Sequence, residues 1–256
     1  MIIKVTPSPA AAGAAAADVV LDFLRSRADA VLGFATGSSP LPLYTALSAS
    51  GRDFSAVRGF ALDEYLGLPP GHPESYATVI EREVVERLGL RAGAVRVPDA
   101  GAPDPERAAS EYEAAIKAAG GVDLQILGIG HNGHVAFNEP GAALDSRTRV
   151  EALTERTRSA NARFFASLEE VPRRCITQGI GTILDARHLL LIAHGGDKAE
   201  IVARALQGPV STDCPASALQ LHPRVTVVLD EAAAAGLDGI HPPEPAGIRA
   251  GVRARS

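Results

Sequence analysis

The predicted fold rests on two stretches of sequence: residues 189–193, Leu-Leu-Leu-Ile-Ala, and residues 225–229, Val-Thr-Val-Val-Leu. Neither stretch alternates strictly between apolar and polar residues, as a strand with one face in water does. Continuous apolar runs of this length are typical of parallel strands that helices cover on both faces. Similar patterns predict strands at 2–6, 30–36, 57–62, 95–98 and 122–129, and the strands of the two quoted stretches are predicted at 189–194 and 225–229.

Longer segments between these strands are predicted to be helices. They span residues 10–26, 42–48, 75–88, 105–119 and 198–206. The alternation of strands and helices predicts a Rossmann-like α/β fold of three layers, with a mostly parallel central sheet and helices on both faces. In such a sheet, ligands bind beyond the carboxyl ends of the strands. The loops that follow the strands are therefore the places where site residues are expected.

The composition is that of a globular protein. Hydrophobic residues make up 46% and charged residues 21% of the chain, which excludes disorder throughout. The net charge of −5 argues against a nucleic-acid binder, and no apolar run reaches the roughly 20 residues of a membrane span. Cys175 and Cys214 form neither a disulfide framework nor a metal-ligand spacing. We expect a cytoplasmic protein with one domain over 1–235 and a poorly ordered tail over 236–256.

The first candidate loop is a run of small residues directly after the apolar residues 31–35. It contains Thr36, Gly37, Ser38 and Ser39, and a helix is predicted to begin shortly after it. Small residues let backbone amides approach an anion, hydroxyls add donors, and the start of a helix adds positive potential. The loop therefore suits a sugar phosphate, although an ordinary capped turn between a strand and a helix has the same composition.

The second candidate is a pair of carboxylates, Asp63 and Glu64, after the strand at 57–62. A carboxylate is costly to bury, and one that lies near a carbon acid can act as a general base. The alternative is that the pair caps a helix in a solvated loop. Lys198 presents a similar choice, because it follows the strand at 189–194 and either binds a phosphate or lies free on the surface.

The third and most informative candidate is the loop Leu-Gly-Ile-Gly-His-Asn-Gly-His-Val-Ala-Phe-Asn-Glu-Pro over residues 127–140. Its glycines permit a tight path and a close approach to a ligand. His134 exchanges protons near neutral pH, and Glu139 follows five residues later, where it can orient or charge the imidazole. His131 and His134 lack the spacing of a zinc-binding pair, so we expect no metal here.

Together these motifs resemble those of the glucosamine-6-phosphate deaminase family. The matching blocks follow the family's order from about Val31 to Glu231: TGSSPLPLYTAL, FALDEYLGLPPGHPESY, LGIGHNGHVAFNEPG, LTERTRSANARFF, TQGIGTILDARHLLLIAHGGDKA and LQLHPRVTVVLDE. The resemblance implies an enzyme of amino sugar metabolism that isomerises and deaminates glucosamine 6-phosphate to fructose 6-phosphate and ammonia. No organic cofactor is implied, because this reaction needs no electron transfer and no external carbanion sink.

The resemblance also implies catalytic roles for four of the candidate residues. Asp63 would move a proton between C2 and C1 of the open-chain sugar. His134 would open the pyranose ring with help from Glu139. Asn132 stands where some members of the family have aspartate. Because an amide takes up no proton, Asn132 would only form hydrogen bonds and orient its neighbours.

For the phosphate, the resemblance implies a site on the loop at 36–39, with Lys198 and Arg163 as cationic partners. The enolamine intermediate of such a reaction must be kept from water, which calls for a lid. Residues 147–165 are expected to form this mobile lid, because the segment is charged and Arg163 near its end would bring a positive charge onto the phosphate.

Hexameric members of the family are activated at a site between subunits that binds a phosphorylated compound, and the present chain departs from that pattern. Arg149 is retained, but Glu151 takes the place of an expected lysine. Ala142 and Ala152 take the place of expected hydroxyls, and no tyrosine follows Tyr112. An acidic residue repels a phosphorylated ligand. We therefore expect the activator site to be absent and the protein to be a monomer or a small homo-oligomer.

Three alternatives remain open at this point. 6-Phosphogluconolactonase has a related fold and a similar Gly-His loop, but Glu139 does not belong to its pattern. Galactosamine 6-phosphate would undergo the same deamination, and the sequence does not show which residues read the hydroxyl at C4. A sugar-phosphate-responsive regulator would carry an added DNA-binding segment, for which the chain has no room.

Overall fold

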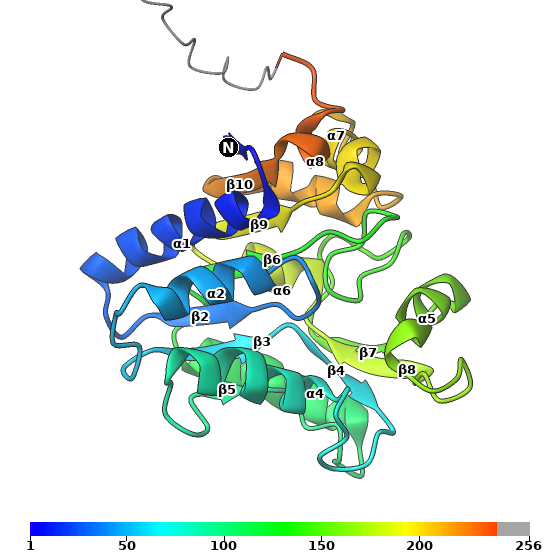
Figure 1. Ribbon diagram of the computed structural model, residues 1–256. Coiled ribbons are helices and arrows are strands. Elements are labelled where there is room, and N and C mark those ends of the chain that lie inside the picture. The colour runs from blue at the N-terminus through cyan, green and yellow to red at the C-terminus, as the bar shows by residue number, and fades with distance from the viewer. Residues whose placement is uncertain (240–256) are drawn as a thin grey trace, which may run out of the picture.

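Seven parallel strands form the main sheet of the computed structural model, which describes residues 1–239 (Figure 1). The strands lie in the order β1-β10-β9-β6-β2-β3-β5. Their bounds are Ile2–Thr6 (β1), Val31–Phe34 (β2), Arg58–Ala61 (β3), Val95–Arg96 (β5), Leu124–Leu127 (β6), Leu189–Ala193 (β9) and Val225–Asp230 (β10). Every pairing in this sheet is parallel, which confirms the predicted α/β fold. Of the predicted tail, residues 240–256 lie outside the described part of the chain.

The five predicted helices are present with small shifts of their ends. They are α1 (Pro9–Ser26), α2 (Leu41–Ala49), α3 (Tyr76–Ile80) with its π-helical continuation η1 (Glu81–Glu86), α4 (Pro105–Ala118) and α7 (Ala199–Gln207). Shorter helical elements that were not predicted are α5 (Glu155–Asn161), η2 (Ala162–Phe164), α6 (Ile180–Leu184), η3 (Gly196–Lys198), η4 (Pro215–Leu221) and α8 (Glu231–Ala234). Helices α1 and α2 lie side by side over one face of the main sheet (Figure 1). Within residues 1–239, no helix is long and apolar enough to cross a membrane.

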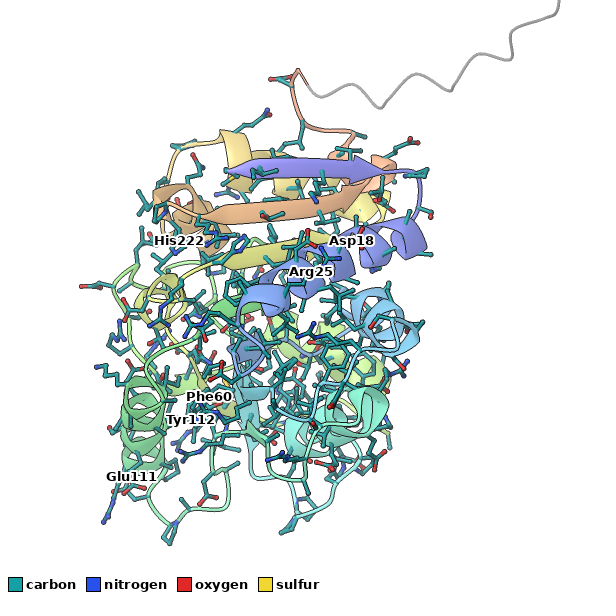
Figure 2. The ribbon with its side chains drawn as sticks, turned by 90° about the vertical axis from the view of Figure 1, so that its left-hand side faces the viewer. Asp18, Arg25, Phe60, Glu111, Tyr112 and His222 are labelled. Atoms are coloured by element: carbon teal, nitrogen blue, oxygen red, sulfur yellow. The ribbon has the colours of Figure 1, made fainter. Side chains whose placement is uncertain are left out.

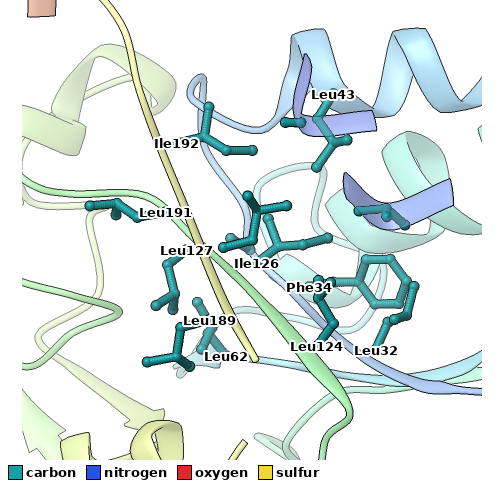
Figure 3. Close-up of a cluster of buried hydrophobic side chains, with 14 of the residues drawn as sticks. Leu32, Phe34, Leu43, Leu62, Leu124, Ile126, Leu127, Leu189, Leu191 and Ile192 are labelled. Atoms are coloured by element: carbon teal, nitrogen blue, oxygen red, sulfur yellow. The ribbon is translucent and has the colours of Figure 1, made fainter. Parts of the chain in front are cut away.

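The hydrophobic core lies on the central strands of this sheet. All residues of β2, β6, β9 and β10 are buried. Figure 3 shows leucine, isoleucine and phenylalanine side chains of β2, β6 and β9 gathered there, together with Leu43 from α2. Burial on both faces of the sheet explains why these strands are mostly apolar, with Gln125, Thr226 and Asp230 as their polar residues.

A second, smaller sheet was not predicted from the sequence. It contains β4 (Asp63–Leu66), β8 (Arg174–Thr177) and β7 (Arg149–Ala152) in the order β4-β8-β7, and both pairings are antiparallel. In Figure 1 it lies beside the main sheet together with α5. Leu62 alone separates β3 from β4, so the chain passes from one sheet to the other at Asp63.

Helix α4 is fixed to both sheets through two successive residues, Tyr112 and Glu113. The Tyr112 hydroxyl donates to the backbone carbonyl of Ala61 at 2.7 Å, and its ring packs edge-on against Phe60, 5.6 Å between centroids (Figure 2). The carboxylate of Glu113 accepts hydrogen bonds from a wider group of residues: Arg147, Thr148 and Thr182. Glu113 therefore connects α4 to α6 and to the residues that lead into β7.

We expect the Glu113→Gln variant to have a free energy of unfolding lower by about 2–3 kcal/mol at pH 7, because hydrogen bonds to a charged group are lost. Burial opposes ionisation of this carboxyl, but the hydrogen bonds from its partners outweigh it and lower its pKa from 4.5 to about 2. A lowered pKa in the folded state stabilises the fold above pH 4.5, and this contribution is lost as the pH falls toward 2. Urea unfolding of both proteins at several pH values tests this: a difference that does not shrink on acidification would contradict it.

Candidate functional site

The candidate site lies where the order of the strands reverses. From β2 the chain proceeds outward to β3 and β5, and it then returns to β6 and proceeds the other way to β9 and β10. The crevice at such a reversal, beyond the carboxyl ends of the strands, is where ligands bind in open parallel sheets. Loops after the neighbouring strands β9, β6, β2 and β3 meet there. Lys198 follows β9, and the loop at 128–140 follows β6. The loop at 36–39 follows β2, and Asp63 follows β3.

Asp63 is buried at the point where the chain leaves the main sheet. It is only 5% exposed, and no group within residues 1–239 donates a hydrogen bond to its carboxylate. Burial, and to a smaller extent the neighbouring Glu64, raise the pKa of Asp63 well above its ordinary value. A carboxylate whose conjugate acid has a raised pKa is a stronger base, which suits the removal of a proton from carbon.

Glu64 has a structural role that contrasts with that of its neighbour. Its carboxylate accepts backbone hydrogen bonds from Tyr65 at 2.7 Å, Tyr76 at 2.8 Å and Ala77 at 2.7 Å. These bonds tie β4 to the first residues of α3. Of the two carboxylates that the sequence offered, Glu64 therefore caps a helix, and Asp63 remains without a donor in the described residues.

Asn132, His134 and Glu139 form a contiguous group in the loop after β6. The Asn132 side chain donates to Oε2 of Glu139 at 2.6 Å and accepts from the backbone N–H of His134 at 3.2 Å. Nδ1 of His134 lies 3.9 Å from the same Oε2 atom, which is too long for a hydrogen bond. Burial lowers the pKa of His134, and Glu139 opposes this effect. The imidazole is therefore neutral at pH 7 and able to accept a proton.

The second histidine of this loop has a different partner. Nε2 of His131 lies 2.6 Å from Oδ2 of Asp197, and both side chains are largely exposed. Within residues 1–239, no three His, Cys, Asp or Glu side chains are grouped as a metal site requires. The two histidines of the loop therefore have different partners, Asp197 for His131 and Glu139 for His134.

Two glycines in these loops are required by geometry. A Cβ atom at Gly130 would lie 2.2 Å from Cε1 of His134, so the imidazole can occupy its position only because residue 130 has no side chain. Gly37 has a φ of +87°, which L side chains rarely adopt. Both loops also approach each other, because a Cβ at Gly128 would lie 3.5 Å from Cβ of Ser39.

The two predicted phosphate-binding cations lie in different environments. Nζ of Lys198 donates to the backbone carbonyl of Ile129 at 3.0 Å. Burial lowers the pKa of Lys198, Asp197 opposes this, and the positive charge of Arg163 lowers it further. Arg163 is exposed, and its guanidinium carbon lies 4.7 Å from the centroid of the Phe164 ring. Two cations close enough to repel each other form a favourable place for a phosphate.

Glu139 is also bound by residues that the sequence analysis did not single out. Its Oε1 atom accepts a hydrogen bond from the hydroxyl of Thr157 and a longer one, 3.4 Å, from that of Thr154. Thr154 is also the N-cap of α5, since its hydroxyl accepts from the backbone N–H of Thr157 at 3.2 Å. Helix α5 lies within the predicted lid, so the lid segment contacts Glu139 directly.

The other end of α5 contacts the strand that begins with Asp63. Nδ2 of Asn161 donates to the Tyr65 hydroxyl at 2.9 Å. The Phe165 ring packs edge-on against Tyr65 and is stacked on His72, with centroids 6.0 and 5.8 Å apart, respectively. Of the predicted lid over 147–165, the part that forms β7 is paired with β8, and the part from α5 onward rests on side chains near Asp63.

Comparison with known proteins gives consistent matches over most of the chain. The model of a family described as glucosamine-6-phosphate isomerases/6-phosphogluconolactonase matches residues 8–228. A glucosamine-6-phosphate deaminase of Pseudarthrobacter chlorophenolicus is 57% identical over 88% of this chain and 88% of its own length. A glucosamine-6-phosphate deaminase of Streptomyces coelicolor is 52% identical over 93% of each chain.

Two solved structures are similar to different degrees. That of a monomeric glucosamine-6-phosphate deaminase has a TM-score of 0.88 and 38% identity, covering 92% of this chain and 100% of the other. That of a 6-phosphogluconolactonase from Trypanosoma cruzi has a TM-score of 0.75 and 21% identity, covering 93% of this chain and 97% of the other. The second likeness concerns the fold alone.

Proposed function

The chain belongs to the family of glucosamine-6-phosphate isomerases and 6-phosphogluconolactonases, and we propose that within it the protein is a glucosamine-6-phosphate deaminase. The reaction converts glucosamine 6-phosphate and water to fructose 6-phosphate and ammonia. The observation that carries the proposal is the pairing of Asp63, a buried carboxylate without a described donor, with a His134–Glu139 pair at the same edge of the sheet. The deaminase relatives at 52–57% identity support the same choice.

Ring opening is the step assigned to His134. The imidazole, neutral at pH 7, accepts the proton of the O1 hydroxyl and returns it to the ring oxygen, so that the open-chain sugar forms. Glu139 stabilises the imidazolium that exists between the two transfers, and a shortening of the 3.9 Å separation in the substrate complex would bring the two groups into a hydrogen bond. Asn132 holds the Glu139 carboxylate from its other side and takes no proton itself.

Isomerisation is the step assigned to Asp63. Its carboxylate removes the proton from C2 of the open-chain sugar, which gives an enolamine, and the proton is then delivered to C1. Water hydrolyses the imine that results and releases ammonia. The raised pKa of Asp63 favours both halves of this transfer, because the group is a strong enough base to take the proton and a strong enough acid to return it.

The phosphate is assigned to the loop formed by Thr36, Gly37, Ser38 and Ser39, with Lys198 and Arg163 as cations. The mutual repulsion of these two side chains is relieved when a dianion lies between them. Arg163 follows α5 directly, so movement of the lid would carry its charge to the phosphate and at the same time exclude water from the enolamine.

The choice of substrate is tested with purified protein and three compounds: glucosamine 6-phosphate, galactosamine 6-phosphate and 6-phosphogluconolactone. We expect ammonia from glucosamine 6-phosphate in the absence of added metal or cofactor. Activity on the galacto epimer alone would keep the mechanism and change the substrate. Acid release from the lactone, with no ammonia from either amino sugar, would overturn the proposal.

N-Acetylglucosamine 6-phosphate is expected to leave the dependence of rate on substrate hyperbolic and unchanged. Glu151 pairs with the retained Arg149 at 2.7 Å, and Asn138 accepts a further bond from the same guanidinium at 2.9 Å, so its charge is already neutralised. Steady-state kinetics with and without the compound test this, with inorganic phosphate as a control for competition at the active site. A sigmoidal curve that becomes hyperbolic on addition of the compound would contradict the prediction.

We further propose that the protein acts as a monomer in the cytoplasm. The structure with a TM-score of 0.88 is that of a monomeric deaminase, which supports the first part. A phosphorylated sugar does not leave the cell unaided because of its charge, which supports the second. Light scattering coupled to size-exclusion chromatography tests the monomer: a mass of about 26.5 kDa is expected, and a multiple of it would contradict the prediction.

A further inference from the structure

The carboxylate of Glu139 is held between two parts of the molecule. Its Oε2 atom accepts from Asn132 at 2.6 Å and lies 3.9 Å from Nδ1 of His134. Its Oε1 atom accepts from Thr157, and at 3.4 Å from Thr154, both of which belong to α5 or its cap. Thr157 is only 4% exposed, whereas Thr154 is exposed to solvent. The hydroxyl of Thr157 is therefore the buried donor that fixes the rotation of the carboxylate.

The position of α5 depends on contacts far from Glu139. Asn161, its last residue, donates to the hydroxyl of Tyr65, two residues after Asp63, and Arg163 lies two residues further along the chain. A displacement of α5 that separated Asn161 from Tyr65 would also withdraw Thr157 from Glu139, because the two residues lie only four positions apart in one short helix.

We propose that Thr157 is a positioning residue that couples the lid helix to ring opening. This inference rests on the proposed function. When α5 is docked, the Thr157 hydroxyl holds Oε1 of Glu139, so that Oε2 faces the imidazole of His134. When α5 moves away, Glu139 loses this donor and its orientation toward His134. Proton transfer at the sugar ring is thereby efficient only while the segment that carries Arg163 is closed.

The charged groups around His134 make this coupling measurable. Burial lowers its pKa most, Glu139 raises it, and Lys198, His131 and Arg156 lower it further. Because the other three neighbours act in the opposite direction, the pKa of His134 reports how closely the Glu139 carboxylate faces it. Loss of the Thr157 hydroxyl should therefore lower the pKa of His134 even when no substrate is present.

The test compares the Thr157→Val, Thr157→Ser and Thr226→Val variants with the wild type. Thr226 is the matched control, because it is also 4% exposed and its hydroxyl is bonded to His188 at 2.9 Å, away from the site. For Thr157→Val we expect kcat to fall by about 10-fold, KM to change by less than about twofold, and the pKa of His134 followed by imidazole NMR to fall. Thr157→Ser should restore both quantities, and Thr226→Val should affect stability only.

Several results would overturn the proposal. They are an unchanged or raised pKa of His134 in Thr157→Val, a Thr157→Ser variant as impaired as Thr157→Val, or the same kinetic loss in Thr226→Val. If Thr157→Val does not fold, Thr157→Ala is used in its place. The NMR titration needs no turnover, so a wild-type protein inactive on amino sugar phosphates would refute the proposed function and leave the positioning role to be decided by the titration.

Discussion

The Asp63→Asn variant is expected to lose turnover of glucosamine 6-phosphate by a factor of about 10²–10⁴, the range in which a general base contributes to a rate. Binding of the sugar phosphate should persist, because the loop at 36–39, Lys198 and Arg163 are unchanged. The same variant should have a free energy of unfolding higher by roughly 1–3 kcal/mol at pH 7, because a neutral amide replaces a buried carboxylate that no described group satisfies.

The pH dependence of this gain in stability has a defined sign. The pKa of Asp63 is raised in the folded protein, so the ionised carboxylate opposes folding at high pH. Below the ordinary value of 3.8 the group is neutral in both states, and the gain should disappear. Steady-state kinetics, ligand binding by calorimetry and urea unfolding measure the three effects.

A matched control for this variant is the adjacent carboxylate. Burial raises the pKa of Glu64 as well, and its three backbone hydrogen bonds oppose this effect. Glu64→Gln should nevertheless lower the free energy of unfolding, because both carboxylate oxygens accept backbone N–H groups and the NH2 group of glutamine would leave one of these donors unsatisfied. Opposite signs of the stability change at positions 63 and 64 would separate the catalytic from the capping carboxylate. An Asp63→Asn protein that retains wild-type turnover, or that becomes less stable at pH 7, would contradict the assignment.

The His134→Gln variant is expected to lose about 10²–10³-fold in kcat/KM, because glutamine accepts a hydrogen bond but takes up no proton from the O1 hydroxyl. The wild-type kcat/KM should fall as the pH is lowered through the pKa of His134, which burial holds below its ordinary value of 6.5. The kcat/KM of the variant should not show this fall at low pH. A pH–rate profile of both proteins makes the measurement.

The control for this variant is His131→Gln in the same loop. His131 is largely exposed and pairs with Asp197, so its loss should change kcat/KM by only a few-fold. Equal losses at positions 131 and 134 would show that the effect comes from disturbance of the loop and not from a proton transfer by His134.

The main sheet could be predicted because strands that are buried on both faces are mostly apolar, and such runs are visible in the sequence. Strand β9 is apolar without interruption, β10 is apolar apart from Thr226 and Asp230, and both were located to within one residue. Strands β4 and β7 of the second sheet lack such apolar runs. Strand β4 begins with Asp63 and Glu64, and β7 alternates charged Arg149 and Glu151 with apolar residues at an exposed edge. These strands are held by pairing with β8, a long-range contact that local composition does not show.

The residues of the candidate site that directly follow strands could be predicted from the sequence. Thr157, which reaches the site only through a contact with a distant part of the chain, could not. Asp63, Asn132, His134 and Lys198 come from strand-end loops, which the topology brings to one edge of the sheet. Thr157 lies 18 residues beyond Glu139, and its hydroxyl has no distinguishing pattern around it. The sequence around Thr154 indicates at most a helix cap. In the structure Thr154 caps α5 and also donates to Glu139.

The most direct test of the central claim follows the hydrogen at C2 of the substrate. Glucosamine 6-phosphate deuterated at C2 is incubated with the wild-type protein, and ammonia, fructose 6-phosphate and the position of the label are quantified by NMR. A base that transfers a proton between C2 and C1 predicts equal amounts of the two products, with the deuterium lost from C2 and found at C1 or in water. Ammonia without fructose 6-phosphate, or no conversion of the substrate, would contradict it.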